Sequence, residues 1–198
     1  MKERCIGMLC KNRITIYGNS DYVNFMLEKI SGEKTKDYQK VASIDFNKIM
    51  PIPEEIKHRI KCLINNKVKA KFEIMNWCVR NWGTPSNAYD FKSSFAKNNE
   101  ELKSFNYCGR YVYFKCTSPV KNIVIELSKQ FPKATLEYAY EFDINDKNIV
   151  GSFTVKNNSI SNVEEKVLTN KTRSSEYELQ LDKTCKIIQM EDYTNNNV

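Results

Sequence analysis

The side chains that most often do chemistry in proteins are few in this chain: seven cysteines and one histidine, His58, stand among 198 residues. The cysteines occupy positions 5, 10, 62, 78, 108, 116 and 185, and no two of them form a C-x-x-C pair. This spacing predicts neither a metal site nor a disulfide framework. We therefore expect reduced thiols, with Cys62 and Cys116 buried as small apolar side chains, which favours a cytoplasmic location.

No acid/base or nucleophilic constellation stands out. His58 lies between Lys57 and Arg59 on a predicted helix, where we expect it to be exposed, and any Ser-His-Asp or Cys-His arrangement would have to use it. The adjacent glutamates at 54–55 and 100–101 point in different directions on a helix, and no glycine-rich phosphate loop is present. We predict no catalytic residue, no metal and no cofactor, and an unrecognised enzyme is the third choice of function.

The elements that must position these side chains alternate between strands and helices. Apolar alternation predicts strands at 13–17, 88–91, 109–116, 135–142 and 149–155. Helical spacing predicts helices at 20–30, 54–65, 69–80 and 120–131, and two prolines predict an extended segment at 45–53. This order predicts an α+β protein with a ferredoxin-like βαββαβ core: an antiparallel sheet with helices on one face and an insertion at about 44–85 after the first helix.

Two regions follow from composition. We predict a ferredoxin-like domain over 1–156 and a C-terminal extension over 157–198. The extension opens with a polar linker or surface segment at 156–175, and we expect a β-hairpin of strands at 176–181 and 185–190 before a frayed end. No apolar stretch approaches the roughly 18 residues that a membrane span needs, so we expect no membrane partner.

The net charge of +7 is uneven along the chain. Residues 157–198 hold five Lys and Arg against seven Asp and Glu, a net charge of −2, so residues 1–156 carry +9. A basic body suits contact with nucleic acid or with an acidic protein surface, although lysines that only solvate a surface would produce the same count.

The segment 81–87, NWGTPSN, is one candidate recognition loop. Trp82 could anchor a partner there, with Arg80 supplying charge. The structural interpretation, which we favour, is that Trp77 and Trp82 cover the open face of the sheet while asparagine side chains form hydrogen bonds with the backbone of the turn.

The strand at 109–116 is a second candidate. Tyr111, Tyr113 and Lys115 share one face of it, and Tyr138 and Tyr140 are expected beside them. Aromatic and basic residues on the central strands of RNA-recognition domains stack bases, but the RNP motif of those domains is missing here. The alternative is that helices or the insertion cover these tyrosines.

Five motifs, in order over about residues 8–156, resemble the YubB ferredoxin-like family of phage and plasmid (Api-like) proteins. They are CKNRITIYG at 10–18, DFNKIMPIPE at 45–54, NWCVRNWGTPSNA at 76–88, TSP at 117–119 with the following helix and Phe131-Pro132, and LEYAYE at 136–141. Ser86 replaces the second tryptophan of the family signature, and no aromatic residue precedes Ser118-Pro119.

The resemblance implies a protein of a mobile genetic element that acts in the cytoplasm of a bacterial host. We expect a non-catalytic protein that binds a host protein or ribonucleoprotein, and our specific hypothesis is anti-CRISPR-like inhibition of a host defence nuclease complex by stoichiometric occlusion. The alternative is a direct RNA- or DNA-binding protein that uses a basic, tyrosine-bearing sheet face. The predicted binding residues are Arg80, Trp82, Arg110, Tyr111, Tyr113 and Lys115.

Overall fold

The computed structural model describes residues 9–32, 44–62, 66–94, 107–144 and 147–168. All of these except Leu168 belong to one compact unit, Met1–Val167, and Leu168 opens a second unit, Leu168–Val198. The predicted hairpin at 176–190 lies outside the described residues. Within the described ranges, no helix is long and apolar enough to cross a membrane.

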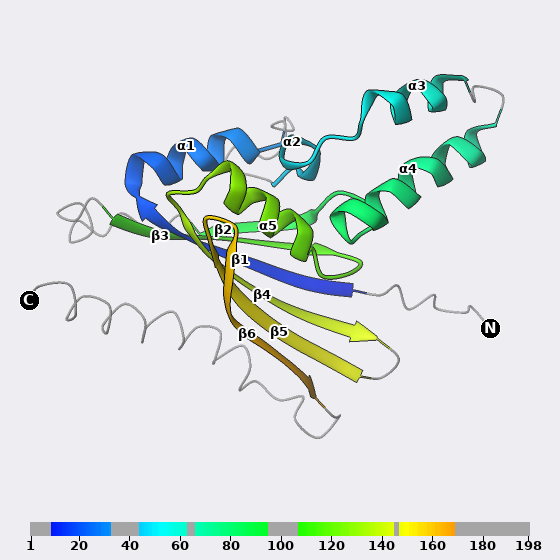
Figure 1. Cartoon of the computed structure of the whole chain (residues 1–198). Coiled ribbons are helices and arrows are strands. Elements are labelled where there is room, and N and C mark those ends of the chain that lie inside the picture. Colours follow the sequence, from blue (N-terminus) through cyan, green and yellow to red (C-terminus); the bar gives the residue numbers. More distant parts are fainter. Residues whose placement is uncertain (1–8, 33–43, 63–65, 95–106, 145–146, 169–198) are drawn as a thin grey trace, which may run out of the picture. The chain divides into compact units, whose positions relative to one another are not determined.

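Six strands form a single sheet in the order β2-β3-β1-β4-β5-β6 (Figure 1). The pairs β1–β3, β1–β4, β2–β3 and β4–β5 are all antiparallel. The prediction of an α+β protein built on an antiparallel sheet is confirmed, and the arrangement is consistent with a ferredoxin-like fold. The elements in chain order are β1 (Leu9–Asn19), α1 (Ser20–Ile30), α2 (Phe46–Ile49), α3 (Glu54–Cys62), α4 (Lys67–Trp82), β2 (Tyr89–Ser94), β3 (Tyr107–Cys116), α5 (Lys121–Gln130), β4 (Thr135–Ile144), β5 (Lys147–Lys156) and β6 (Ser159–Leu168).

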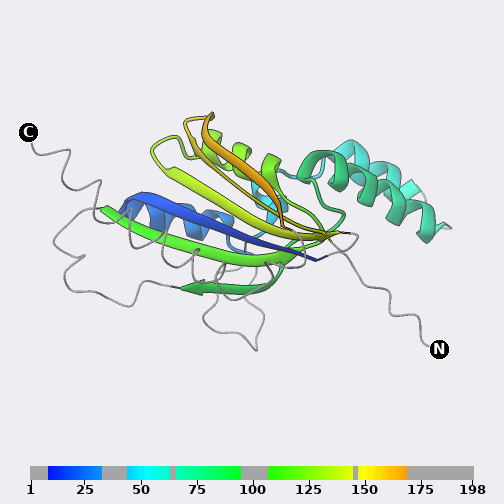
Figure 2. The ribbon, with the colours of Figure 1, turned by 90° about the horizontal axis from the view of Figure 1, so that it is seen from below.

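Helices α1 and α5 cover one face of the sheet, which we call the covered face (Figures 1 and 2). Their apolar stripes meet alternate residues of the central strands, because strand side chains point to opposite faces in turn. Each large apolar side chain buried in this way contributes about 1.5–3 kcal/mol relative to exposure. The buried set includes Ile14, Ile16, Phe114 and Leu136 from the sheet, Val23 and Met26 from α1, and Ile123 and Leu127 from α5.

The prediction of an extended chain over 45–53 is wrong at its start, where α2 forms a short helix. The Asp45 side chain caps this helix by accepting a hydrogen bond from the backbone N–H of Asn47 at 2.9 Å. Pro51 disfavours helix only in the residue before it, and that residue, Met50, ends the helix with φ −135° and ψ 87°.

The polar segment predicted at 156–175 contains a strand, β6, that the sequence pattern missed. Asn157 and Asn158 join it to β5 with φ values of +47° and +63°, which a two-residue turn of the type I′ class requires and which asparagine tolerates. Every residue of β6 from Ser159 to Val167 is exposed. With no buried side, the strand has no apolar alternation from which it could be predicted.

Candidate binding surface

The predicted binding residues of β3 lie on two different faces of the sheet. Tyr111, Tyr113 and Lys115 point to the face opposite α1 and α5, which we call the far face, because they alternate with buried residues that begin at Val112. Arg110 precedes Val112 by two positions and therefore belongs to the covered face. The fold thus separates Arg110 from the tyrosines of its own strand.

Cross-strand neighbours give the far face charges of both signs. Lys115 is in register with Lys11 of β1, and Tyr113 is in register with Arg13. On the other side of β1, the Lys11 ammonium forms a salt bridge with the Glu141 carboxylate of β4 at 3.0 Å. Such a partly exposed pair contributes at most about 1 kcal/mol, but it shows that basic and acidic groups are interleaved on this face.

The prediction that Tyr138 and Tyr140 lie beside Tyr111 and Tyr113 is wrong. Tyr138 is in register with Ile14, a core residue, so both tyrosines of β4 point to the covered face, where they are buried. The strand alternation was predicted correctly, but the register between β1 and β4 decides which set of alternating residues faces the helices.

Trp82, the predicted anchor, is a core side chain. It is 4% exposed, and its indole N–H donates to the Met50 carbonyl oxygen at 2.8 Å. Its ring contacts those of Trp77 and Phe46, with centroid distances of 5.7 and 5.8 Å. Phe46 in turn contacts Phe114 of the covered face. Trp82 therefore has the packing role of the structural interpretation, but it packs on the covered face and not on the open face as predicted.

The loop that follows Trp82 connects three parts of the fold. Gly83 adopts φ +86°, and a Cβ atom there would lie 2.8 Å from the Pro119 carbonyl oxygen, so the close approach requires glycine. The Thr84 hydroxyl lies 3.0 Å from that of Thr117. Asn87 Oδ1 accepts a hydrogen bond from the first backbone N–H of α2 at 3.0 Å. These contacts hold α4, α2 and the turn before α5 together.

A buried polar network, which sequence reasoning did not identify as a unit, lies beneath α5. Tyr138 OH donates to Asn12 Oδ1 at 2.6 Å and accepts from the Val120 N–H at 2.8 Å. Asn12 Nδ2 donates to Cys116 Sγ at 3.0 Å and to the Cys10 carbonyl oxygen at 3.1 Å. Burial raises the pKa of Tyr138, and the hydrogen bond with Cys116 raises that of Cys10. The only signal in the sequence is an asparagine at an inward position of an alternating strand.

The one histidine lies where it was expected, on the exposed surface of α3. The prediction that Cys62 is buried is wrong, because α3 has no buried residue and Cys62 is exposed, with its Sγ 3.9 Å from His58 Nδ1. Cys116 is buried, as predicted. Among the described residues, no group of three or more His, Cys, Asp or Glu side chains could hold a metal ion.

Helix α4 has an apolar stripe that is largely exposed. Val68, Phe72, Met75 and Val79 recur at i, i+4, i+7 and i+11, which places them on one face of the helix; we call them the α4 stripe. Val68 is 68% exposed, Phe72 54% and Val79 48%. The helical pattern at 69–80 was predicted, but its exposure was not, because periodicity does not tell whether a partner element covers the stripe.

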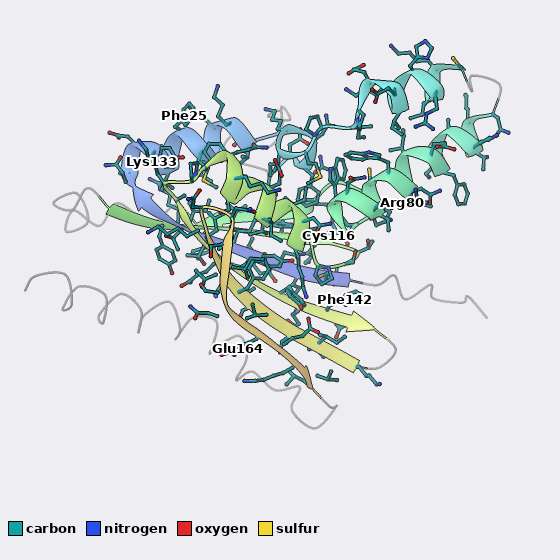
Figure 3. All side chains as sticks on the ribbon, viewed as in Figure 1. Phe25, Arg80, Cys116, Lys133, Phe142 and Glu164 are labelled. Atoms are coloured by element: carbon teal, nitrogen blue, oxygen red, sulfur yellow. The ribbon has the colours of Figure 1, made fainter. Side chains whose placement is uncertain are left out.

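Basic side chains flank the α4 stripe. By helical spacing, Lys69 and Arg80 lie on one side of it, with Glu73 in the same row, and Lys71 lies on the other side; the three basic residues are exposed. Arg80 projects from the C-terminal part of α4 (Figure 3). Helix α3 packs beside α4 (Figure 1), and the hairpin of residues 54–82 holds seven basic and three acidic residues, a net charge of +4.

Comparison of the chain with known proteins finds no match to a protein-family model, to a curated protein or to a solved structure. The resemblance to the YubB ferredoxin-like family therefore stays a prediction from the five motifs.

Proposed function

We propose that β1, α1, β2, β3, α5 and β4 form a ferredoxin-like βαββαβ core, with α2, α3 and α4 as an insertion between α1 and β2. The support is the strand order β2-β3-β1-β4, in which the first strand is central and both crossover helices cover the same face. The core acts as a scaffold for the insertion, as rigid sheets do for the loops that carry function in many domains.

We further propose that the chain is a non-catalytic protein of a phage or other mobile element that binds a host macromolecule and blocks it stoichiometrically. The leading candidate for this target is a defence nuclease complex, as in an anti-CRISPR protein. The observation that carries the proposal is the α3–α4 hairpin, which presents apolar and basic side chains on an outer face of the described fold. Exposed apolar side chains gathered on one surface mark interaction sites in proteins.

The second candidate function is direct binding of RNA or DNA through Tyr111, Tyr113 and Lys115. What favours it is their common position on the far face, in register with Thr15, Arg13 and Lys11. What weighs against it is a pair of acidic residues on the same face, Glu137 and Glu141 of β4, on the other side of β1, because carboxylates repel phosphates.

The test is a titration of the purified full chain into a reconstituted CRISPR effector nuclease with its guide RNA and target DNA. We expect loss of cleavage that saturates near one chain per complex and does not grow with incubation time. Inhibition by far fewer copies, increasing with time, would mean an enzyme and would overturn the proposal.

A parallel titration with bare 20-nucleotide RNA and DNA distinguishes the second candidate function, nucleic-acid binding, from the first. Binding that weakens steeply with salt, and that Tyr111→Ala and Lys115→Glu abolish, would favour nucleic-acid recognition instead. If the protein instead acts by occlusion, we expect it not to bind the bare RNA or DNA at physiological salt.

A further inference from the structure

The α4 stripe is an apolar surface that the described fold leaves exposed. Phe72 at its centre is 54% exposed, although Cys78 and Trp82 further along the same helix are buried. The described fold therefore covers only part of the apolar surface of α4. Leaving a phenylalanine and two valines in water forgoes stabilisation that a bound partner would supply.

The basic residues beside the stripe indicate the charge that its partner carries. Lys69, Lys71 and Arg80 border it, and within the described part of the chain none of them takes part in a salt bridge. We infer that the α4 stripe docks on a protein surface whose apolar centre is rimmed by carboxylates. This inference rests on the proposed function and names the chemistry of its partner. Opposite charges at such a rim speed association and fix the orientation of the two surfaces.

Other occupants fit the stripe less well. A second copy of this chain would bring two hairpins of net charge +4 face to face, and like charges oppose that contact. Nucleic acid would find one aromatic ring, that of Phe72, among aliphatic side chains, because Val68, Met75 and Val79 can neither stack on bases nor donate hydrogen bonds.

A lipid surface is also less suited. Helices that lie in a membrane interface insert large aromatic and leucine side chains. The two tryptophans of α4 are not available for this, because Trp82 is buried and Trp77 packs against it. The stripe then offers only one aromatic ring, that of Phe72.

The test uses a fluorescent synthetic helix with a leucine stripe flanked by glutamates, titrated with the full chain and followed by anisotropy. We expect binding that weakens about tenfold or more on Phe72→Ser and on the double change Lys69→Glu with Arg80→Glu. The matched control is Phe25→Ser on α1, since Phe25 is also half-exposed, at 49%, and has Lys29 over its ring at 5.4 Å. Phe25 projects from a different helix (Figure 3) and its change should leave binding unaltered.

Two further probes complete the design: vesicles of phosphatidylserine and phosphatidylcholine, and a peptide in which lysines replace the glutamates. The inference is overturned if the lysine peptide binds equally well, if Phe72→Ser and Phe25→Ser act alike, or if only the vesicles bind. These measurements need no nuclease, so a failure of the nuclease titration with successful peptide binding would reject the proposed target and keep the docking surface.

Discussion

The hydroxyl of Tyr138 and the side-chain amide oxygen of Asn12 lie 2.6 Å apart inside the core, on neighbouring strands β4 and β1. Both residues are about 1% exposed. The same hydroxyl accepts the Val120 N–H just before α5 begins, so one buried tyrosine satisfies polar groups of the sheet and of a helix start. A buried polar group is tolerated only when such partners are present.

Replacing Tyr138 with phenylalanine is expected to lower the free energy of unfolding by about 1–3 kcal/mol. The change keeps the ring but leaves the Val120 N–H and the Asn12 amide oxygen without this buried partner. Urea unfolding of the two proteins would measure the difference. Tyr111→Phe is the matched control, because Tyr111 is exposed at 38% and its change should shift stability by less than about 0.5 kcal/mol. Equal stability of Tyr138→Phe and the unchanged chain would contradict the network.

Stability should decrease in alkaline solution. Burial raises the pKa of Tyr138 well above its ordinary value of 10.0 and that of Cys78 above 9.0. As pH rises, the unfolded chain therefore loses these protons before the folded chain does. The folded state keeps its full stability below the ordinary pKa values, and it loses stability as pH rises above them. Each group adds a slope of up to about 1.4 kcal/mol per pH unit.

Unfolding free energies measured along a pH series would reveal this loss. Tyr138→Phe should reduce the slope of the part of the curve above the ordinary tyrosine value of 10.0, where Tyr140 still contributes because burial raises its pKa as well. A curve that stays level through this range would show that these groups are not protected from ionisation.

Gly151→Ala should destabilise the sheet by about 1–3 kcal/mol. Gly151 is in register with Tyr140, and a Cβ atom at position 151 would lie 2.4 Å from the Tyr140 ring, far inside van der Waals contact. The ring cannot move away easily, because Tyr140 is buried and its hydroxyl bonds to Glu165.

Gly18→Ala provides the comparison for this substitution. Its added Cβ would meet Val23 at 3.4 Å, an ordinary contact, so thermal unfolding should occur within a few degrees of the unchanged chain. Similar losses for both alanines would indicate a general need for glycine in these strands and not a contact with Tyr140.

Most strands and helices could be predicted from local pattern alone. The alternation in β3 and the helical spacing in α1 and α5 reflect one buried side for each element, and that side leaves its period in the sequence. Strand β6 has no buried side, and the helix at Phe46–Ile49 is a single turn capped by Asp45 and by the distant Asn87, so neither has a period to detect.

The candidate site shows the same division between local and long-range information. Sequence determined which residues of β3 share a face, that α4 is a helix, and that the chain carries a basic excess, because these depend on neighbours along the chain. Only the tertiary structure decided that Tyr138 and Tyr140 are buried, that Trp82 packs in the core, and that the α4 stripe is exposed. Burial depends on strand register and on which element packs against which, and those contacts join residues far apart in the sequence.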